Sequence, residues 1–469
     1  MEAPAPAPAK PKAKPKAKAP TEAAASASTA TTTKKKLIVL CDGTWCGSET
    51  NTEGNIFLLA KMIGIDMAPH AKRNEFESRE RGVKACYFPG SGLGGTFLEY
   101  LFNGATGSDI GEDCIEVYSY IVQHFSEDHE IWMFGLSRGS YTVRCVAGMI
   151  NNCGIIRKTT TSDGQLDDRT IRLCNEVYKI YRSSEPEDHP KAKTILRFKE
   201  QVSYNVPTPV KFMGLLDTVG SRGIPKLDAG IGLTYPEFRD QKVSKAVEKV
   251  YHALAIHDRL WGFGPCRALR EADPNKPKLE IHERWFPGCH YDLGRQRFRF
   301  LRNGQNWLER AAGVVLSPLL NVIEPNHVLA DFVLQWMLES IRKEDPEGIV
   351  IQGINDEIEK LTASMLAPTP KIGSGDIYSH IIDYGPLGTV WKGLGTPIML
   401  AQTRDRRISD TKADLAFYNH PSPQLAGSTI QELAKIDSKR YPSQTYDNFI
   451  LYLESMGLGV HTTEPAPED

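Results

Sequence analysis

EIWMFGLSRGS, residues 130–140, is an apolar run that passes directly into a serine flanked by glycines. Ser137 lies two residues from Gly135 and two from Gly139, which is the G-x-S-x-G pattern. On a sharp turn from a buried strand into a helix, such a serine presents its hydroxyl at the edge of a sheet, and small neighbours leave room for the turn. The pattern alone is a weak signal, so the rest of the chain must supply the strand and the helix.

Four further segments share the design of a short apolar or aromatic run that ends at glycine or aspartate. They are LIVLCD (37–42), KACYFPG (84–90), VKFMGLLDTVG (210–220) and EIHERWFPG (280–288). Helix-like stretches lie between the runs, at residues 55–64, 109–125 and 140–154. Alternation of buried strands with helices predicts an α/β fold, a mostly parallel sheet with helices on both faces. Ligands of such sheets bind beyond the carboxyl ends of the strands.

Two other residues stand where strand ends would place them beside Ser137. The run 210–220 carries Asp217 near its end, and the run 280–288 leads into CHYD with His290. The order serine, aspartate, histidine is that of α/β-hydrolases, in which the histidine takes the serine proton and the carboxylate orients the imidazole. Ser137, Asp217 and His290 are therefore the predicted nucleophile, acid and base of an α/β-hydrolase-like core. A general base of this kind contributes about 10²–10⁴ in rate.

Other groups compete for the acid and base roles. Asp292, shortly after the predicted base, is an alternative acid, or it braces its loop by accepting from backbone N–H groups. His257 and Asp258 belong to SKAVEKVYHALAIHDR, residues 244–259, a helix-like stretch in which we expect a packed or surface role. His420 also follows in the required order, but its surroundings are turn-like and no strand leads into it. It therefore ranks below the predicted base.

Acyl transfer also needs donors for the negative charge that forms on a carbonyl oxygen, each worth about 3–4 kcal/mol. The backbone N–H of Arg138, directly after the nucleophile, is one expected donor. Gly43 and Thr44, in the turn CDGTW after the first strand, are the expected source of the second. In the alternative interpretation, this turn only ends the strand and Asp42 caps it.

The glycine-rich loop FPGSGLGG, residues 88–95, could suggest a phosphate site. It lacks the G-K-[ST] ending of a P-loop, and its spacing departs from the dinucleotide fingerprint. We expect the loop to let the backbone approach the predicted site closely, and the sequence predicts no cofactor and no metal.

Several motifs in a fixed order resemble a known family. LCDGTW, YFPGSGLGG, GLSRGS, GLLDTVGS, HALAIHDR and WFPGCHYDLG, spread over residues 36–295, resemble an uncharacterised α/β-hydrolase domain family that includes the catalytic domain of type VI secretion phospholipase effectors. The resemblance implies a hydrolase of acyl esters, in some members phospholipids. It maps the family's serine, aspartate and histidine onto Ser137, Asp217 and His290.

The chain departs from the family pattern at two places. Cys46 stands where the family usually has asparagine after DGTW, and LGRQ, residues 293–296, replaces a run of glycines. The second difference concerns the rim of the expected pocket. It makes Arg295 a candidate for contact with a substrate phosphate or carboxylate.

Composition divides the chain into three parts. Residues 1–36 are rich in alanine, proline and lysine and lack large apolar side chains, which predicts a disordered tail that serves as a solubilising leader more readily than as a nucleic-acid or membrane contact. Residues 37–300 form the predicted catalytic core, with a polar helical insertion near 160–205. Residues 301–469 are expected to form a mainly helical cap or extension with a flexible end.

Two apolar stretches stand out in the C-terminal part. AAGVVLSPLLNVI, residues 311–323, is a candidate for a lid or for a wall against an acyl chain. HVLADFVLQWMLESI, residues 327–341, has the period of a helix, which indicates a core helix and not a membrane-seeking one.

The overall composition is that of an ordinary soluble globular protein. In 469 residues, 56 basic and 58 acidic side chains give a net charge of −2, so no nucleic-acid partner is expected. The nine cysteines include no C-x-x-C pair and are expected to be buried free thiols. Because no signal-peptide core and no run of ~18 apolar residues is visible, we expect a cytoplasmic location.

Function classes follow from these features. The leading hypothesis is a serine esterase or lipase-like hydrolase whose substrate is a small-molecule or lipid ester, with transient contact to a membrane surface if the ester is a phospholipid. The alternative is a catalytically silent α/β-hydrolase-like binding or scaffold protein, against which the intact set of Ser137, Asp217 and His290 argues. A phosphotransferase with Asp42 as nucleophile would need a second carboxylate two residues later, where Thr44 stands.

Overall fold

The chain divides into two units, residues 1–33 and residues 34–469, and every described residue belongs to the second. The computed structural model describes residues 34–43, 53–68, 71–90, 107–219, 242–256, 258, 265–269, 279–286, 288–297, 324–367 and 414–415. Thr44, Cys46, His257, His420 and the stretch 311–323 lie outside the described residues.

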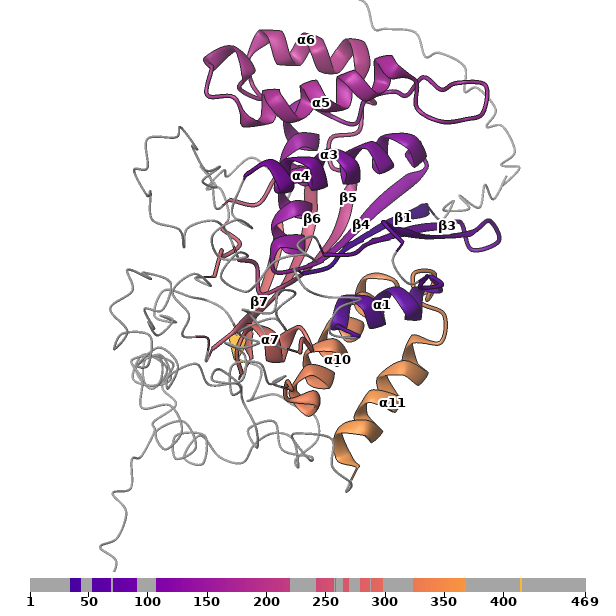
Figure 1. Cartoon of the computed structure of the whole chain (residues 1–469), viewed down its shortest axis with the longest axis vertical. Coiled ribbons are helices and arrows are strands. Elements are labelled where there is room, and N and C mark those ends of the chain that lie inside the picture. The colour runs from indigo at the N-terminus through magenta and orange to yellow at the C-terminus, as the bar shows by residue number, and fades with distance from the viewer. Residues whose placement is uncertain are drawn as a thin grey trace, which may run out of the picture. The chain divides into compact units, whose positions relative to one another are not determined.

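Within the described part of the chain, eight strands form one sheet in the order β2-β3-β1-β4-β5-β6-β7-β8. Their bounds are β1 Lys35–Cys41, β2 Asn74–Ser78, β3 Val83–Phe88, β4 His129–Leu136, β5 Val210–Leu216, β6 Val247–Ala255, β7 Glu280–Phe286 and β8 Asp414–Leu415. β2 is antiparallel to β3, and the other neighbouring pairs are parallel. The predicted α/β fold with a mostly parallel sheet is confirmed (Figure 1).

Helices cover both faces of this sheet (Figure 1). One face carries α3 Gly107–His124 and α4 Arg138–Cys153, with α5 Asp168–Arg182, the 3-10 helix η1 Pro186–Asp188 and α6 Lys193–Val202 outside them. The other face carries α1 Asn55–Ile63, α10 His327–Glu344 and α11 Ile354–Leu366, and the short helix α7 His290–Leu293 follows β7. The helices α5 and α6 thus lie where the polar insertion was expected, and α10 contains the stretch 327–341.

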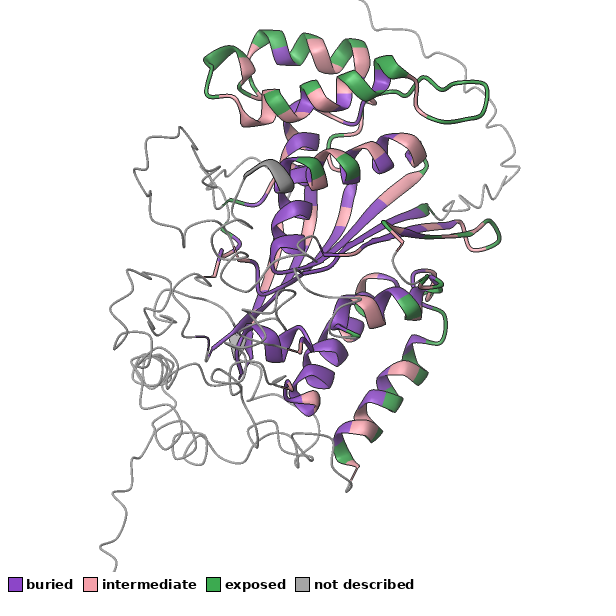
Figure 2. Ribbon diagram, viewed as in Figure 1, coloured by how far each residue is buried: buried purple, intermediate pink, exposed green. Residues whose placement is uncertain are grey.

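The central strands are buried along most of their length because both of their faces are covered. In β1, Leu37 and Val39 pack on the side of α3 and α4, whereas Ile38 and Leu40 pack on the side of α1 and α10. Figure 2 shows the consequence, a sheet that is buried on both sides, while α5, α6 and α11 each expose one flank. Two separate hydrophobic clusters therefore hold the described unit together.

The strand β6 corrects one prediction. The stretch 244–259 was expected to be helix-like, but Val247–Ala255 is a strand between β5 and β7. The Tyr251 ring stacks between the rings of Phe212 and His282, with centroids 5.0 and 4.6 Å away. A strand covered on both faces need not show a two-residue period, so β6 cannot be distinguished from a helix by pattern alone.

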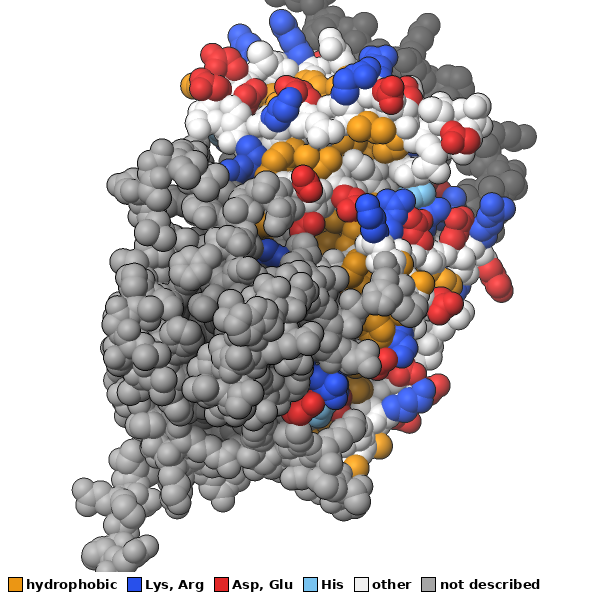
Figure 3. Space-filling view, in the orientation of Figure 1, with side chains coloured by type: hydrophobic (Ala, Val, Ile, Leu, Met, Phe, Trp, Pro, Cys, Tyr) orange, Lys and Arg blue, Asp and Glu red, His pale blue; other side chains and the backbone are white. Residues whose placement is uncertain are grey.

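The described surface carries charges of both signs. Lys and Arg side chains are interspersed with Asp and Glu side chains over the described part of the face in Figure 3. In these same ranges of the chain, no helix combines the length and the hydropathy that crossing a bilayer would require.

Candidate active site

Ser137 occupies a sharp turn between β4 and α4. The strand ends at Leu136 and the helix begins at Arg138, so a single residue makes the turn. The backbone of Ser137 has φ 57° and ψ −118°, a conformation that costs a non-glycine residue on the order of 1–3 kcal/mol. Its N–H donates to the carbonyl oxygen of Leu216 at 2.9 Å, and its carbonyl oxygen accepts from Tyr141 N–H at 3.1 Å. The neighbouring strand β5 and the first turn of the helix thus hold the strained residue in place.

The glycines around Ser137 are required by the closeness of the backbone. A methyl group on Gly139 would overlap the carbonyl oxygen of Cys41 at the end of β1. A methyl group on Gly135 would lie 2.5 Å from the backbone nitrogen of Ser140, which is also too close for a carbon atom. The helix therefore leaves the sheet at a distance that only glycine permits, as the G-x-S-x-G pattern indicates.

Asp217 and His290 meet at the carboxyl edge of the sheet. The imidazole Nδ1 of His290 lies 2.7 Å from Oδ2 of Asp217, although 73 residues separate them. Asp217 is fully buried and His290 is 2% exposed. Since an ionised carboxylate only accepts, the contact places a proton on Nδ1 and leaves Nε2 able to take one. This is the tautomer that a general base requires.

The backbone around Asp217 is also specific. Asp217 follows directly after β5, with a φ of 39°. Its N–H donates to the Ala253 carbonyl oxygen at 2.8 Å, and its Oδ1 accepts from Ala255 N–H at 3.0 Å. Because Leu136 pairs with Leu216 across parallel strands, Ser137 and Asp217 both come one residue after paired positions. The structure thus brings the serine turn and the aspartate to neighbouring strand ends.

The other acidic candidates hold backbone groups near His290. The carboxylate of Asp292 accepts from Cys289 N–H at 3.0 Å and from Asn326 N–H at 2.9 Å, which braces the loop between β7 and α10. The described contact to the imidazole is made by Asp217. Asp258 is buried, which agrees with the packed role that was one of its two expected alternatives, and it accepts from the His290 N–H at 3.0 Å, a contact that the sequence did not predict. The motif HALAIHDR, which contains Asp258, was the sequence feature that could have pointed to this contact.

The turn after β1 approaches the serine from the other side. Asp42 accepts from the Tyr87 hydroxyl at 2.7 Å and from Gly43 N–H at 2.7 Å. Gly43 lies against Leu136, since a methyl group on it would be 3.0 Å from Leu136 Cγ. Asp42 therefore caps this turn, and the Gly43 N–H that was expected to face an oxyanion donates to Asp42 in this structure. The N–H of Arg138 belongs to the first turn of α4, where helix geometry supplies no acceptor within the helix.

Arg295 contacts protein groups on two helices. Its guanidinium pairs with Asp331 of α10, donates to Asn55 Oδ1 of α1 at 3.1 Å and lies 3.2 Å from His327 Nδ1. The Arg295 side chain is buried, and its backbone has a φ of 56°. These contacts fasten the segment after α7 to α1 and α10, so the described geometry gives Arg295 a role in packing, unlike the substrate contact suggested by its place in LGRQ.

Two further kinds of site would depend on histidine, cysteine or acidic side chains, namely metal sites and reactive thiols. The ranges that the structure describes contain no group of three or more His, Cys, Asp or Glu side chains arranged to hold a metal ion. The eight cysteines in these ranges are buried free thiols. Burial is the main cause that raises the pKa of Cys153, to about 12, so this thiol stays protonated at neutral pH.

The chain is similar to a known protein family. The model of the family "T6SS, Phospholipase effector Tle1-like, catalytic domain" matches residues 35–340. An uncharacterized protein of Saccharomyces cerevisiae, YEL023C, is 24% identical over 206 residues, which cover 40% of this chain and 28% of the yeast protein. The chain therefore spans less than a third of the length of that relative.

Two solved structures are also similar at low identity. One is the Tle1 effector bound to the VgrG spike from the type 6 secretion system, with 15% identity, a TM-score of 0.35 and coverage of 70% of this chain and 76% of that chain. The other is an uncharacterized protein from Pseudomonas aeruginosa, with 13% identity, a TM-score of 0.31 and coverage of 79% of this chain and 56% of that chain.

Proposed function

Since the chain belongs to the family of Tle1-like catalytic domains of T6SS phospholipase effectors, we propose that it is a serine hydrolase of carboxylic esters whose substrates are lipids, phospholipids included. One observation carries the chemical part of the proposal: the hydrogen bond between His290 Nδ1 and Asp217 Oδ2 at the strand end next to the strained Ser137. Family membership supports the lipid part.

The proposed reaction has two halves. His290 Nε2 takes the proton of the Ser137 hydroxyl while the serine oxygen attacks the ester carbonyl, and the Asp217 carboxylate stabilises the imidazolium that results. Collapse of the tetrahedral intermediate transfers the proton from the imidazolium to the leaving alcohol and leaves an acyl group on Ser137. A water molecule, deprotonated by His290, then releases the carboxylic acid and restores the serine.

The oxyanion of each intermediate needs two donors. The N–H of Arg138, the residue after the nucleophile, is the first in the proposal, because it opens α4 directly beside Ser137. The turn at residues 42–44 is the proposed source of the second, since Gly43 packs against Leu136. Use of the Gly43 N–H would require it to exchange Asp42 for the oxyanion.

A fluorophosphonate probe tests the proposal, because it phosphonylates a serine only when a base activates it. We expect the wild-type protein to be labelled, Ser137→Ala not to be labelled, and His290→Ala to be labelled far more slowly. Labelling that persists in Ser137→Ala would contradict the assignment of the nucleophile. A folded wild-type protein that is not labelled would instead support the silent binding or scaffold protein.

Substrate class is tested separately, on protein that has not been treated with the probe. Short-chain esters, a lysophospholipid and a diacyl phospholipid in vesicles are offered to the wild type and to Ser137→Ala. We expect release of fatty acid from the phospholipid by the wild type alone. Hydrolysis of short-chain esters without any release from either phospholipid would restrict the proposal to a soluble esterase.

A further inference from the structure

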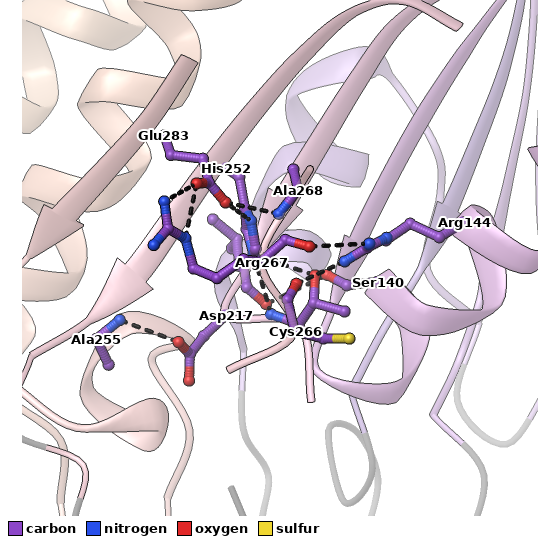
Figure 4. A network of polar contacts seen from close by, with 11 residues as sticks. Ser140, Arg144, Asp217, His252, Ala255, Cys266, Arg267, Ala268 and Glu283 are labelled. Atoms are coloured by element: carbon purple, nitrogen blue, oxygen red, sulfur yellow. Dashed lines mark hydrogen bonds and ion pairs between the residues drawn. The ribbon is translucent and has the colours of Figure 1, made fainter. Parts of the chain in front are cut away.

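A second histidine–carboxylate pair lies directly beside Asp217. His252 of β6 has its Nε2 3.2 Å from the N–H of Thr218 and 3.1 Å from the Thr218 hydroxyl. On its other side, His252 Nδ1 lies 3.0 Å from Oε1 of Glu283, in β7. Figure 4 shows His252 and Glu283 joined with Arg267 in one polar network near Asp217. His252 is the first residue of the motif HALAIHDR, but the sequence assigned no role to it or to Glu283.

The contacts of Glu283 define the protonation of this pair. Arg267 donates to Glu283 Oε2 through Nε at 2.7 Å and also through Nη2, and Ala268 N–H donates to Oε1 at 2.8 Å. Burial alone would raise the pKa of Glu283, but its contacts with His252 and Arg267 outweigh burial and lower the pKa to about 2. An ionised Glu283 accepts from His252 Nδ1, which leaves Nε2 as the acceptor for the Thr218 N–H.

His252 itself is held in its neutral form. Burial lowers its pKa, against the opposing charges of Glu283 and Asp217 and together with that of Arg144. These three charged groups come from β7, from the end of β5 and from α4. Protonation would turn Nε2 into a donor facing the donor N–H of Thr218, so the neutral state is the one that fits the geometry.

The network also reaches the helix that carries the nucleophile turn. Arg144 of α4 donates to the carbonyl oxygens of Cys266 at 2.6 Å and Arg267 at 3.1 Å, and Cys266 N–H donates to the Thr218 carbonyl oxygen at 2.8 Å. One helical turn before Arg144, the hydroxyl of Ser140 donates to the Leu216 carbonyl oxygen at 3.2 Å. The residues on both sides of Asp217 are therefore tied to α4.

Asp217 needs such support because its backbone is strained. A φ of 39° is unfavourable for a non-glycine residue and persists only when the surroundings impose it. The backbone groups on both sides of it have partners. Before it, the Leu216 carbonyl oxygen accepts from Ser137 N–H and from the Ser140 hydroxyl, and the Asp217 N–H donates to the Ala253 carbonyl oxygen. After it, the Thr218 N–H donates to His252 and the Thr218 carbonyl oxygen accepts from Cys266 N–H. Of these partners, His252 is held in place by its hydrogen bond to the ionised Glu283.

We propose that His252 and Glu283 are positioning residues, which hold the turn at Asp217 and Thr218 so that the Asp217 carboxylate meets His290. This inference rests on the proposed function of the site. Thr218, His252 and Glu283 repeat the chemical order of a nucleophile, a base and an acid. Thr218 and His252 are 0% exposed, however, so they reach no substrate and act through Asp217.

The test measures fluorophosphonate labelling against pH in variants of the full chain. His252→Phe removes the acceptor of the Thr218 N–H without a change of charge, and His252→Gln restores an amide that can accept. Glu283→Gln, which keeps the size of the side chain, is measured in parallel. Leu361→Ala, in α11 on the opposite face of the sheet from α4, serves as the control for a general loss of stability.

We expect His252→Phe to lower the labelling rate of the folded protein by about ten-fold or more, because small displacements of catalytic groups have large effects. The pH midpoint of labelling should also move to lower pH, since a displaced Asp217 stabilises the imidazolium of His290 less well. His252→Gln should recover most of the rate, and Glu283→Gln should lose rate in the same direction as His252→Phe.

Distinct results would overturn the two proposals. If folded His252→Phe and Glu283→Gln keep the wild-type labelling rate and pH midpoint, the positioning role is wrong. It is also wrong if Leu361→Ala, at the same melting temperature as His252→Phe, loses as much of the labelling rate as His252→Phe does. If the folded wild-type protein is not labelled at all, the proposed function itself is wrong.

Discussion

Asp217 Oδ2 lies 2.7 Å from His290 Nδ1, and the backbone N–H of His290 donates at 3.0 Å to Asp258. His290 is therefore held by two buried carboxylates, one that contacts its ring and one that accepts from its backbone N–H. Because only one of these contacts reaches the ring, we expect replacement of the two carboxylates to affect catalysis differently.

Replacement of Asp217 should affect catalysis much more than stability. Asp217→Asn removes the charge that stabilises the imidazolium and permits the wrong tautomer, so we expect kcat for an ester substrate to fall by about 10³–10⁴ with little change in KM. Asp292→Asn is the matched control, because Asp292 bonds only backbone N–H groups among its described contacts. Equal losses of kcat in the two variants would contradict the assignment of Asp217 as the acid.

Replacement of Gly139 should destabilise the fold through steric overlap. Gly139→Ala places a methyl group on the carbonyl oxygen of Cys41, and we expect a loss of about 3 kcal/mol or more in the free energy of unfolding. Gly164→Ala is the control. Gly164 has a φ of +80° but no atom within 4 Å of an added methyl, so only the backbone cost of about 1–2 kcal/mol applies. Urea unfolding measures both, and a smaller loss for Gly139→Ala would contradict the close approach.

Arg295 should contribute to stability and not to turnover. Arg295→Met leaves Asp331 buried without its cation, so the expected loss is about 3–5 kcal/mol in the free energy of unfolding. Arg295→Met combined with Asp331→Leu should recover part of this loss, because no uncompensated charge remains. Fluorophosphonate labelling per folded molecule should stay at the wild-type rate. A raised KM for a phospholipid in stable Arg295→Met would instead support the substrate contact suggested by the sequence.

Stability should decrease on mild acidification. Burial lowers the pKa of His252 below its ordinary value of 6.5, so the unfolded chain takes up a proton at a pH where the folded protein does not. The stabilisation from neutral His252 is complete above pH 6.5 and is lost as the pH falls below that value towards the lower pKa of the folded state.

Urea unfolding of the wild type and of His252→Gln between about pH 7.5 and pH 5 measures this effect. The free energy of unfolding should fall more steeply with decreasing pH in the wild type, by up to about 1.4 kcal/mol per pH unit. Parallel slopes for the two proteins would show that His252 is not a buried neutral group.

Local pattern in the sequence determined most of the sheet and the position of the serine turn. The runs that became β1, β3, β4, β5 and β7 each contain apolar or aromatic residues and end at glycine or aspartate. Strands covered on both faces need largely apolar side chains, and sharp turns need small or turn-forming residues. The strand β6 was missed because its buried residues do not alternate with the two-residue period of a strand.

Tertiary structure alone decided the partners. That Asp217 contacts the His290 imidazole, that Asp258 accepts from its backbone N–H and that Arg295 pairs with Asp331 all depend on contacts between segments far apart in the chain. His252 begins the motif HALAIHDR but lay in a stretch assigned to a helix, and Glu283 lay in a strand run outside the motifs, so the sequence did not pair them. Hydrogen bonds have direction and a range of about 3 Å, so which polar side chains pair is settled only when strands and helices pack.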